Sequence, residues 1–441
     1  MKFIYCLLRF YIVMALVAQG KERWDYFGSE VEDAGGVRWN YNSGLSSLRH
    51  YIQHFTFFKG RPFMMWRYFS GYFRTKVLKQ RVLRSVELAV TYDCNLRCDK
   101  CFALKWLNEE DKRDFMTIDE IKEMWDQAYK LGAVHVNITG GEPLMRRDIV
   151  EVVKALKPKR TLVSLVTTGI FLTEEKAREL KKAGLNTFQI SLDSAIPSEH
   201  DQYRGYKGSY DKVFNAVKIA KKVGINVILS TVITHQNVKT DAIPNLLEIA
   251  EKNDTFLLLN IAGRSGGWSK KDYLLVTQEE REKFVTEFCK HPRARISQMF
   301  NFYGKPGICN MGKDKLNISA YGEVYPCTYV ALVFGKLFGK NKRKLKDIWD
   351  QMNEFEYFKG FTTACRRVDD EDFAKKYITK LAMHDKPFMN LEDVEAKIKE
   401  EEVSGKTVQI ITKLPIVDDN GALESHGSCG SGSCGSCGPE E

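Results

Sequence analysis

The chain has 441 residues, of which 44% are hydrophobic, a composition typical of a globular protein that buries a substantial core. The absence of short internal repeats excludes a solenoid. The formal net charge is +10, and the 11 cysteines are clustered rather than spread as a disulfide framework would be. Clustered cysteines in a large enzyme favour metal ligation by reduced thiols, and therefore a cytoplasmic and anaerobic setting.

The first 84 residues precede any alternation of strands and helices. Residues 3–18 are mostly apolar but short, with Arg9 near their middle, so we expect a packed or interfacial helix, with a signal peptide as the alternative. Residues 55–84 carry eight Lys or Arg and nine aromatic residues without one acidic residue. This mixture favours an anionic membrane surface or a nucleic acid, although a solvated face on a helix that packs against the core gives the same pattern.

From residue 86 onward the pattern predicts alternating strands and helices. Strands are expected at residues 86–91, 134–139, 161–167, 187–192, 226–233 and 255–261. Helices are expected at residues 117–131, 147–156, 173–184, 210–223 and 244–252. The first helix begins with a capping box from Thr117 to Glu120 and stops at Gly132, and Thr173 caps the third. Repeated units of this length predict an α/β fold with a parallel sheet, open or curled into a barrel of fewer than eight strands.

The loop after the first expected strand reads Cys94-Asn-Leu-Arg-Cys98-Asp-Lys-Cys101. This spacing lets a short chain wrap one corner of an iron–sulfur cube, and three cysteines leave one iron of a four-iron cluster without a protein ligand. An open iron can bind a small chelating molecule through an amine and a carboxylate. Structural zinc is the alternative, but it needs four protein ligands, and no fourth Cys or His lies near this loop.

A second motif, Gly140-Gly141-Glu142-Pro143, directly follows the second expected strand. The two glycines permit close backbone approach to a ligand, Glu142 can accept from a bound ammonium, and Pro143 stiffens the turn. An ordinary strand-to-helix turn would explain the glycines but not their order behind the cysteine loop.

With both motifs in place, residues 85–266 resemble the radical S-adenosylmethionine (radical SAM) superfamily. The resemblance implies a partial (β/α)6 TIM-like barrel with a [4Fe–4S] cluster held by Cys94, Cys98 and Cys101, whose open iron binds S-adenosylmethionine. The cluster would pass one electron to S-adenosylmethionine, releasing methionine and a 5′-deoxyadenosyl radical that abstracts hydrogen from a substrate. A flavodoxin-type or ferredoxin-type donor would supply the electron.

The same resemblance suggests further contacts to S-adenosylmethionine. For each of them, core packing or an ordinary strand-end hydrogen bond explains the residue equally well. Phe102 is expected near the adenine. The polar candidates stand at or after strand ends: Thr167, Thr168, Ser191, Asp193, Arg204 and Ser230.

A second cysteine set follows the barrel. Cys309 and Cys327, with Gly322 between them, resemble the opening of the SPASM and Twitch extensions, which bind auxiliary iron–sulfur clusters. The intervening residues 317–326 predict a β-hairpin with a glycine turn. Cys365 would be a third ligand. The usual later run of close cysteines is absent, so we expect one auxiliary cluster in a shortened domain, with buried structural thiols as the alternative.

These patterns divide the chain into five parts. They are an N-terminal basic and aromatic helical segment (residues 1–84), the barrel (85–300), the small cysteine-containing extension (301–368), a charged helical extension (369–425) and a flexible Gly/Ser/Cys tail (426–441). The tail cysteines fit a cluster cap, a sulfur or metal carrier, a mobile redox appendage or a peptide-like substrate tail. Packing roles are expected for Cys6, Cys289 and the core-strand His135.

Three functions compete. The favoured one is a radical enzyme acting on a lipid or isoprenoid, peripheral at the inner face of the membrane, because aromatic and basic side chains suit anionic head groups. The alternative is a maturase of a peptide or protein, suggested by the auxiliary-cluster extension. The third is a non-enzymatic iron–sulfur electron carrier. A nucleic-acid partner is not expected, since no recognised RNA-binding module is visible.

Overall fold

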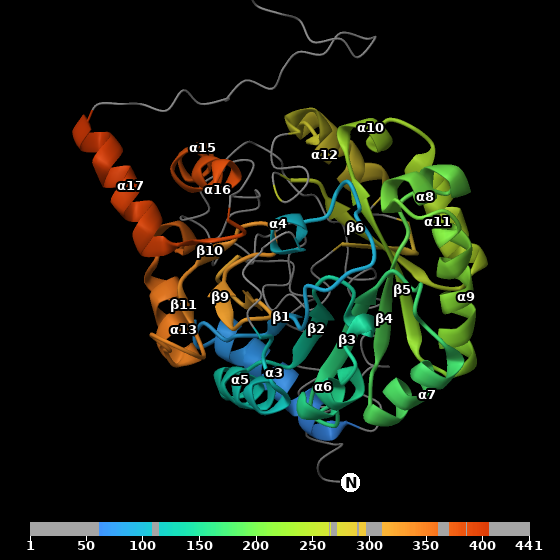
Figure 1. Cartoon of the computed structure of the whole chain (residues 1–441), viewed down its shortest axis with the longest axis horizontal. Helices are drawn as coiled ribbons and strands as arrows, with labels where there is room; N and C mark the ends of the chain where they lie inside the picture. The colour runs from blue at the N-terminus through green and yellow to red at the C-terminus, as the bar shows by residue number, and fades with distance from the viewer. Residues whose placement is uncertain are drawn as a thin grey trace, which may run out of the picture.

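The computed structural model describes residues 61–107, 114–263, 265, 271–288, 291–296, 311–359, 370–384 and 386–404. A ten-stranded sheet, in the order β11-β9-β8-β1-β2-β3-β4-β5-β6-β7, forms its centre (Figure 1). The six expected strands are all present and each is parallel to the next. They are β1 (Ser85–Ala89), β2 (His135–Thr139), β3 (Leu162–Thr167), β4 (Thr187–Ser191), β5 (Asn226–Ile233) and β6 (Phe256–Ile261). These strands and their helices make the partial (β/α)6 barrel.

The expected helices cover the outer face of the sheet (Figure 1). They are α5 (Ile118–Leu131), α6 (Ile149–Ala155), α7 (Glu174–Ala183), α9 (Ser209–Lys222) and α11 (Ala242–Lys252). Alternate strand residues such as Val86 and Leu88 join helix residues such as Trp125 in one buried core. The other face of the sheet turns inward and carries polar side chains. The capping box at Thr117 and the stop at Gly132, whose φ is +118°, are confirmed.

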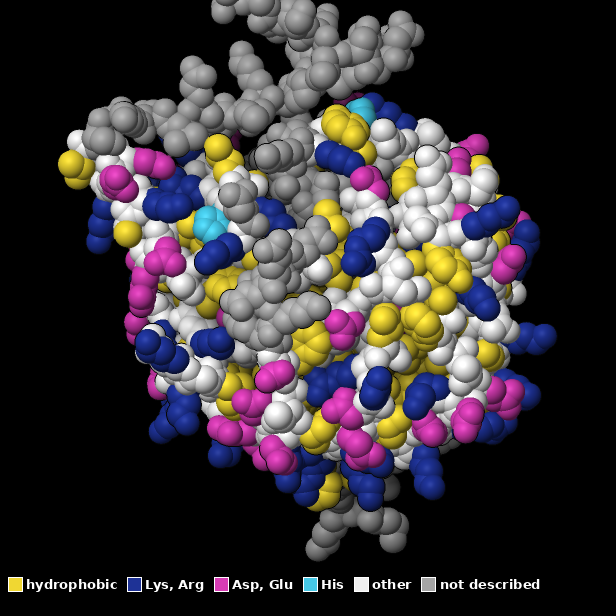
Figure 2. Space-filling model, viewed as in Figure 1, with side chains coloured by type: hydrophobic (Ala, Val, Ile, Leu, Met, Phe, Trp, Pro, Cys, Tyr) yellow, Lys and Arg dark blue, Asp and Glu magenta, His cyan; other side chains and the backbone are white. Residues whose placement is uncertain are grey.

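Several short elements of the barrel region were not predicted from the sequence, among them α4 (Leu104–Leu107), α12 (Gln278–Lys283) and three that flank the later strands. Helix α8 (Pro197–Arg204) follows β4, helix α10 (His235–Val238) follows β5, and β7 (Ala294–Ile296) extends the sheet beyond β6. Helix α8 begins with proline at its first position and ends at Gly205, whose φ is +64°. In Figure 2, hydrophobic side chains gather to the right of centre, over the region of β4 and β5, and charged side chains of both signs line the lower rim.

The basic and aromatic segment forms helix α3 (Pro62–Lys76), which packs at the amino-terminal end of the parallel strands. Met64 and Tyr68 are buried there with Val134 and Leu162, and the Arg67 guanidinium lies 3.6 Å from the centre of the Tyr129 ring. One face of this helix therefore belongs to the barrel. No helix in the described ranges is long and apolar enough to cross a bilayer. Residues 1–60, with Cys6, lie outside the described ranges.

The C-terminal extension continues the barrel sheet. Strands β8 (Lys315–Ile318) and β9 (Glu323–Tyr325) form the expected hairpin, turning at Gly322, whose φ is +85°. Strand β8 also pairs in parallel with β1, which the sequence analysis did not foresee. Beyond it come β10 (Leu332–Val333), β11 (Gly335–Lys336) and helix α13 (Leu345–Glu354), another unforeseen element.

The charged helical extension expected after residue 369 consists of several separate elements in its described part. The described part consists of α15 (Glu371–Phe373), a π-helical turn (Ala374–Ile378), α16 (Thr379–Met383), β12 (Met389–Asn390) and α17 (Leu391–Ser404). Pro387 lies between α16 and β12 and cannot continue a helix, because proline lacks the backbone N–H. Strand β12 then pairs with β10.

Candidate cluster and S-adenosylmethionine site

The Gly140-Gly141 turn packs closely against the backbone of the segment that leads into the cysteine loop. The Gly141 N–H donates to the Thr91 carbonyl, and the Glu142 N–H donates to the Asp93 carbonyl, both at 2.8 Å. A Cβ on Gly140 would lie 2.1 Å from the Thr91 oxygen, and one on Gly141 would lie 2.3 Å from the Asp93 oxygen. The glycines therefore let this turn support the strand that leads into Cys94. The close approach to a ligand that the sequence analysis expected at these glycines stays a prediction.

Glu142 is fully buried, and its carboxylate is already saturated. One oxygen accepts from the Leu144 N–H at 3.1 Å and the Thr167 hydroxyl at 2.7 Å. The other accepts from the Thr168 N–H at 2.8 Å and the Thr168 hydroxyl at 2.7 Å. A carboxylate offers about four acceptor positions, so a bound ammonium would have to displace one of these donors. Glu142, Thr167 and Thr168 thus join the turn after β2 to the end of β3.

Cys94, Cys98 and Cys101 are partly exposed in the single loop after β1. The Cys101 N–H donates to the Cys98 carbonyl at 3.2 Å, which holds the second half of the loop in a turn. Burial raises the pKa of the Cys94 thiol and raises that of Cys101 to about 12. Three thiols in one loop fit the soft ligands of an iron–sulfur cluster, whose irons bind them as thiolates. Among the described residues, no three His, Cys, Asp or Glu side chains converge on a position for a single metal ion.

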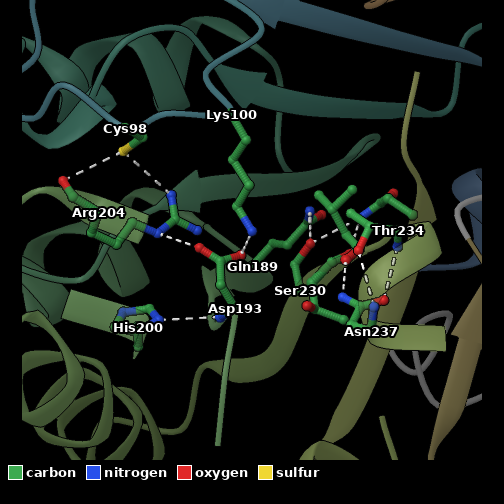
Figure 3. Close-up of polar contacts among 12 residues, drawn as sticks. Cys98, Lys100, Gln189, Asp193, His200, Arg204, Ser230, Thr234 and Asn237 are labelled. Carbon is green, nitrogen blue, oxygen red and sulfur yellow. Dashed lines mark hydrogen bonds and ion pairs between the residues drawn. The ribbon is translucent and has the colours of Figure 1, made fainter. Parts of the chain in front are cut away.

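A buried ionic network lies beside Cys98 (Figure 3). The Asp193 carboxylate, just after β4, pairs through one oxygen with the Arg204 Nε at 2.8 Å and through the other with the Lys100 ammonium. Arg204 Nη1 donates to the Cys98 sulfur at 3.8 Å, and the Cys98 thiol donates to the Arg204 carbonyl. His200 Nδ1 accepts from the Asp193 N–H at 3.1 Å. Burial opposes the charged form of Asp193, but Arg204 and Lys100 outweigh it and hold its pKa below the ordinary value.

The remaining candidates lie on neighbouring elements. Ser191 and Ser230 are paired in register on β4 and β5, and the Ser230 hydroxyl accepts from Gln189 at 3.1 Å and from Asn260 at 3.0 Å (Figure 3). Phe102 packs against a small aromatic core beside the cysteine loop. Pro143 is buried and begins a short 3-10 turn (Pro143–Met145). His135 has the packing role that the sequence analysis expected, since its two ring nitrogens form hydrogen bonds with the Ser85 and Ser164 hydroxyls.

The inner face of the sheet holds a row of polar residues that sequence reasoning missed. Asn137, Glu87 and Asn317 stand side by side in register on β2, β1 and β8. The Asn137 amide donates to Glu87 at 2.9 Å, and Lys315 pairs with the other Glu87 oxygen at 2.9 Å. Asn317 accepts from Thr328 at 2.7 Å. The sequence signal for this row was Glu87 in the middle of the first strand, because a charge within a buried strand is seldom found without a partner.

Two amide atoms of this row have no hydrogen-bond partner among the described residues. They are Asn137 Oδ1 and Asn317 Nδ2, on side chains that are 8% and 1% exposed. Because Glu87 is an acceptor when ionised, Asn137 must present its NH2 to it, which leaves the oxygen unpaired. Buried polar atoms without partners are uncommon and mark places where a ligand can supply the missing bonds.

The extension contributes one described cysteine, Cys327, which is partly exposed. Cys309 and Cys365, the other expected ligands of an auxiliary cluster, lie outside the described residues, as do Cys289 and the tail cysteines. Aromatic packing ties this extension to the residues around the cysteine loop: the Tyr321 ring centre lies 5.5 Å from that of Tyr92, which stacks on Trp106 at 4.7 Å.

Comparisons with known proteins agree with these features. The radical SAM superfamily matches residues 88–248, and the SPASM iron–sulfur cluster-binding domain matches residues 309–371. A GTP 3′,8-cyclase of Peptoclostridium acidaminophilum is 31% identical over 233 residues, which cover 52% of this chain and 70% of the cyclase. The chain belongs to the radical SAM superfamily. It is therefore an enzyme that uses a [4Fe–4S] cluster and S-adenosylmethionine, with an auxiliary iron–sulfur domain, as its cysteine motifs imply.

Other relatives of this radical SAM enzyme are peptide cyclases. The PqqA peptide cyclase of Rhizobium meliloti (strain 1021) is 29% identical over 288 residues, covering 62% of this chain and 74% of the relative. Among solved structures, Streptococcus suis SuiB bound to S-adenosylmethionine is 19% identical, with a TM-score of 0.48, covering 63% of this chain and 67% of that one.

Proposed function

We propose that this radical SAM enzyme modifies a peptide or protein by hydrogen abstraction, with Cys94, Cys98 and Cys101 as the cluster ligands. When bound, the cluster supplies the electron that cleaves S-adenosylmethionine reductively. The chain's own residues hold this chemistry in place. The Gly140-Gly141 turn holds the segment before the cysteine loop through backbone hydrogen bonds, and Glu142 links that turn to the end of β3. The Asp193 network lies beside Cys98.

The observation that carries the peptide assignment is the pair of amide atoms on the inner face of the barrel that have no hydrogen-bond partner in the part of the chain that the structure describes. Asn137 presents an acceptor and Asn317 a donor, on opposite sides of Glu87. A peptide group offers the complementary donor and acceptor, whereas an acyl or isoprenoid chain offers neither and would leave both buried atoms unsatisfied. The similarity to PqqA peptide cyclases supports the same choice. The peptide alternative therefore has more support than the lipid substrate that the sequence analysis favoured.

The test compares a strain lacking the gene with strains complemented by the wild type or by the Cys94→Ala/Cys98→Ala/Cys101→Ala variant. Peptides and lipids of all three are profiled by mass. The expected result is a peptide mass change that requires the wild-type enzyme. A change confined to lipids would overturn the peptide assignment. Purified wild-type protein, reconstituted without oxygen, should also release 5′-deoxyadenosine from S-adenosylmethionine when dithionite supplies the electron; no release would refute the assignment of Cys94, Cys98 and Cys101 as ligands of the reacting cluster.

One observation favours a second property, contact with an anionic membrane surface. The solvent face of α3 exposes Phe63 and Trp66, which are 70% and 60% exposed, and Phe73 farther along. Arg74 follows on the same helix, and the Arg160 guanidinium lies 6.0 Å from the Phe63 ring centre. The helix contains no acidic residue. Exposed aromatic side chains flanked by cations are the combination that binds anionic interfaces.

Vesicle sedimentation tests this contact. The wild type should sediment with phosphatidylglycerol vesicles and much less with phosphatidylcholine vesicles. The Phe63→Ser/Trp66→Ser variant should lose most of this binding, while the control Met383→Ser, which alters an equally exposed residue on α16, should not. Equal sedimentation of wild type and double variant would refute the contact at α3.

A further inference from the structure

Lys100 occupies an unusual place for a lysine, inside the cysteine loop between Cys98 and Cys101. Its side chain is 10% exposed, and its ammonium pairs with Asp193, whose side chain is 2% exposed. The Tyr203 ring lies on another side, with its centre 5.3 Å from the lysine nitrogen. In Figure 3 the side chain reaches from the loop down to the carboxylate, opposite the approach of Arg204. Burying an ammonium is costly, so this position needs an electrostatic reason.

Neutralising Asp193 is not a sufficient reason, because Arg204 already lies 2.8 Å from that carboxylate. One carboxylate between two cations leaves a surplus formal charge of +1. Arg204 also points Nη1 at the Cys98 sulfur, 3.8 Å away. The surplus charge therefore lies against one of the three cluster thiolates. Reduction potentials of iron–sulfur clusters depend on nearby charge and on hydrogen bonds to the sulfurs.

We propose that Lys100 is a positioning residue that takes one oxygen of Asp193, leaves Arg204 directed at Cys98, and thereby keeps a positive charge beside the cluster that raises its reduction potential. The proposal rests on the assignment of Cys94, Cys98 and Cys101 as cluster ligands.

The adjacent ion pair provides a matched control. Asp99, the residue before Lys100, pairs with Lys271, but this pair is exposed, with side-chain exposures of 52% and 33%. Water and salt screen such a pair, so its loss should leave the electrostatics at the cluster almost unchanged. Lys271→Met and Lys100→Met each remove one positive charge near the cysteine loop. Lys271→Met leaves the buried network of Lys100, Asp193 and Arg204 intact.

The experiment is an anaerobic redox titration of the reconstituted full chain, followed by electron paramagnetic resonance, at matched iron and sulfide content. Lys100→Met should shift the midpoint potential of the [4Fe–4S] cluster to more negative values, Lys100→Arg should restore it, and Lys271→Met should leave it unchanged. Asp193→Asn removes the carboxylate but keeps both cations, so it should shift the potential in the opposite direction.

Hydrogen exchange of the cluster-free protein supplies a second readout. Loss of the Lys100 link should speed exchange of amides at residues 94–101 in Lys100→Met but not in Lys271→Met. A wild-type potential in fully loaded Lys100→Met, or shifts of the same sign in Lys100→Met and Asp193→Asn, would overturn the proposal. Should Lys100→Met fail to load iron, the Asp193→Asn variant tests the proposal instead. A shift of its midpoint potential to more positive values would support the proposal, and a shift to more negative values would overturn it. Wild type without a cluster would instead overturn the assignment of the cysteines.

Discussion

Replacing Glu142 by glutamine tests whether this residue is mainly part of the scaffold. The amide oxygen of glutamine can keep the bonds from Leu144 and Thr167, and the Thr168 hydroxyl can rotate to accept from the new NH2 group. The Thr168 N–H cannot rotate and would face a donor. An unsatisfied buried donor costs about 1–3 kcal/mol, and the other bonds lose their charge assistance. We therefore expect Glu142→Gln to destabilise the cluster-free protein by about 2–3 kcal/mol.

For a chain of this size, such a loss lowers the melting temperature by roughly 2–3 °C. The assay is thermal unfolding of cluster-free protein in reducing buffer without S-adenosylmethionine. Glu120→Gln is the matched control, because Glu120 also accepts two bonds, from the Thr117 N–H and hydroxyl, in a capping box that glutamine serves equally well. A Glu142→Gln melting temperature equal to that of the control would refute the scaffold role and return Glu142 to a role in ligand binding alone.

Three further predictions follow from buried contacts. Gly141→Ala should lower the iron content after reconstitution to well below that of wild type, as measured by iron and sulfide analysis. The alanine Cβ would lie 2.3 Å from the Asp93 carbonyl oxygen and would displace the segment that leads into the cysteine loop. Asp314→Asn should lower the free energy of unfolding in urea by about 3–5 kcal/mol. The wild-type carboxylate lies 2.9 Å from the buried Arg84 guanidinium, and the variant leaves this cation without an anionic partner. Burial and nearby cations lower the pKa of His135 to about 3, so the folded protein keeps it neutral while the unfolded chain gains a proton below about pH 6.5. Its contribution should make the protein less stable by about 2 kcal/mol at pH 5 than at pH 7.5, and His135→Gln should flatten that part of the pH profile.

Local rules were sufficient to predict most of the barrel. Thr117 and Thr173 accept from backbone N–H groups at helix starts, and Gly132 and Gly184 take the left-handed conformation at helix ends. Each of these signals acts within a few residues, so sequence reasoning could find it. The pairing of β8 with β1 escaped because it joins residues far apart in the chain, and no local pattern in residues 315–318 distinguishes this partner from another strand.

The site was predictable where residue type alone fixes the chemistry. Asp193 and Arg204 were expected as contacts to S-adenosylmethionine, which stays a prediction; the structure pairs them with each other and brings Arg204 to Cys98. Lys100 escaped because a lysine in a loop is ordinarily solvated, and its burial depends on Asp193 from another strand. Glu142 was expected to bind a ligand, but the number of protein donors that surround it is a tertiary property that the motif does not encode.

The parallel pairing of β8 with β1 has a consequence for how the protein is made. Strand β1 is one of the first described elements to leave the ribosome, and β8 follows after the other barrel strands. Until β8 arrives, one edge of β1 presents unpaired N–H and C=O groups, which makes the emerging chain a template for strand addition and aggregation. Completion of the extension therefore protects the barrel, and a chain that ends before residue 315 would keep this edge open for its lifetime.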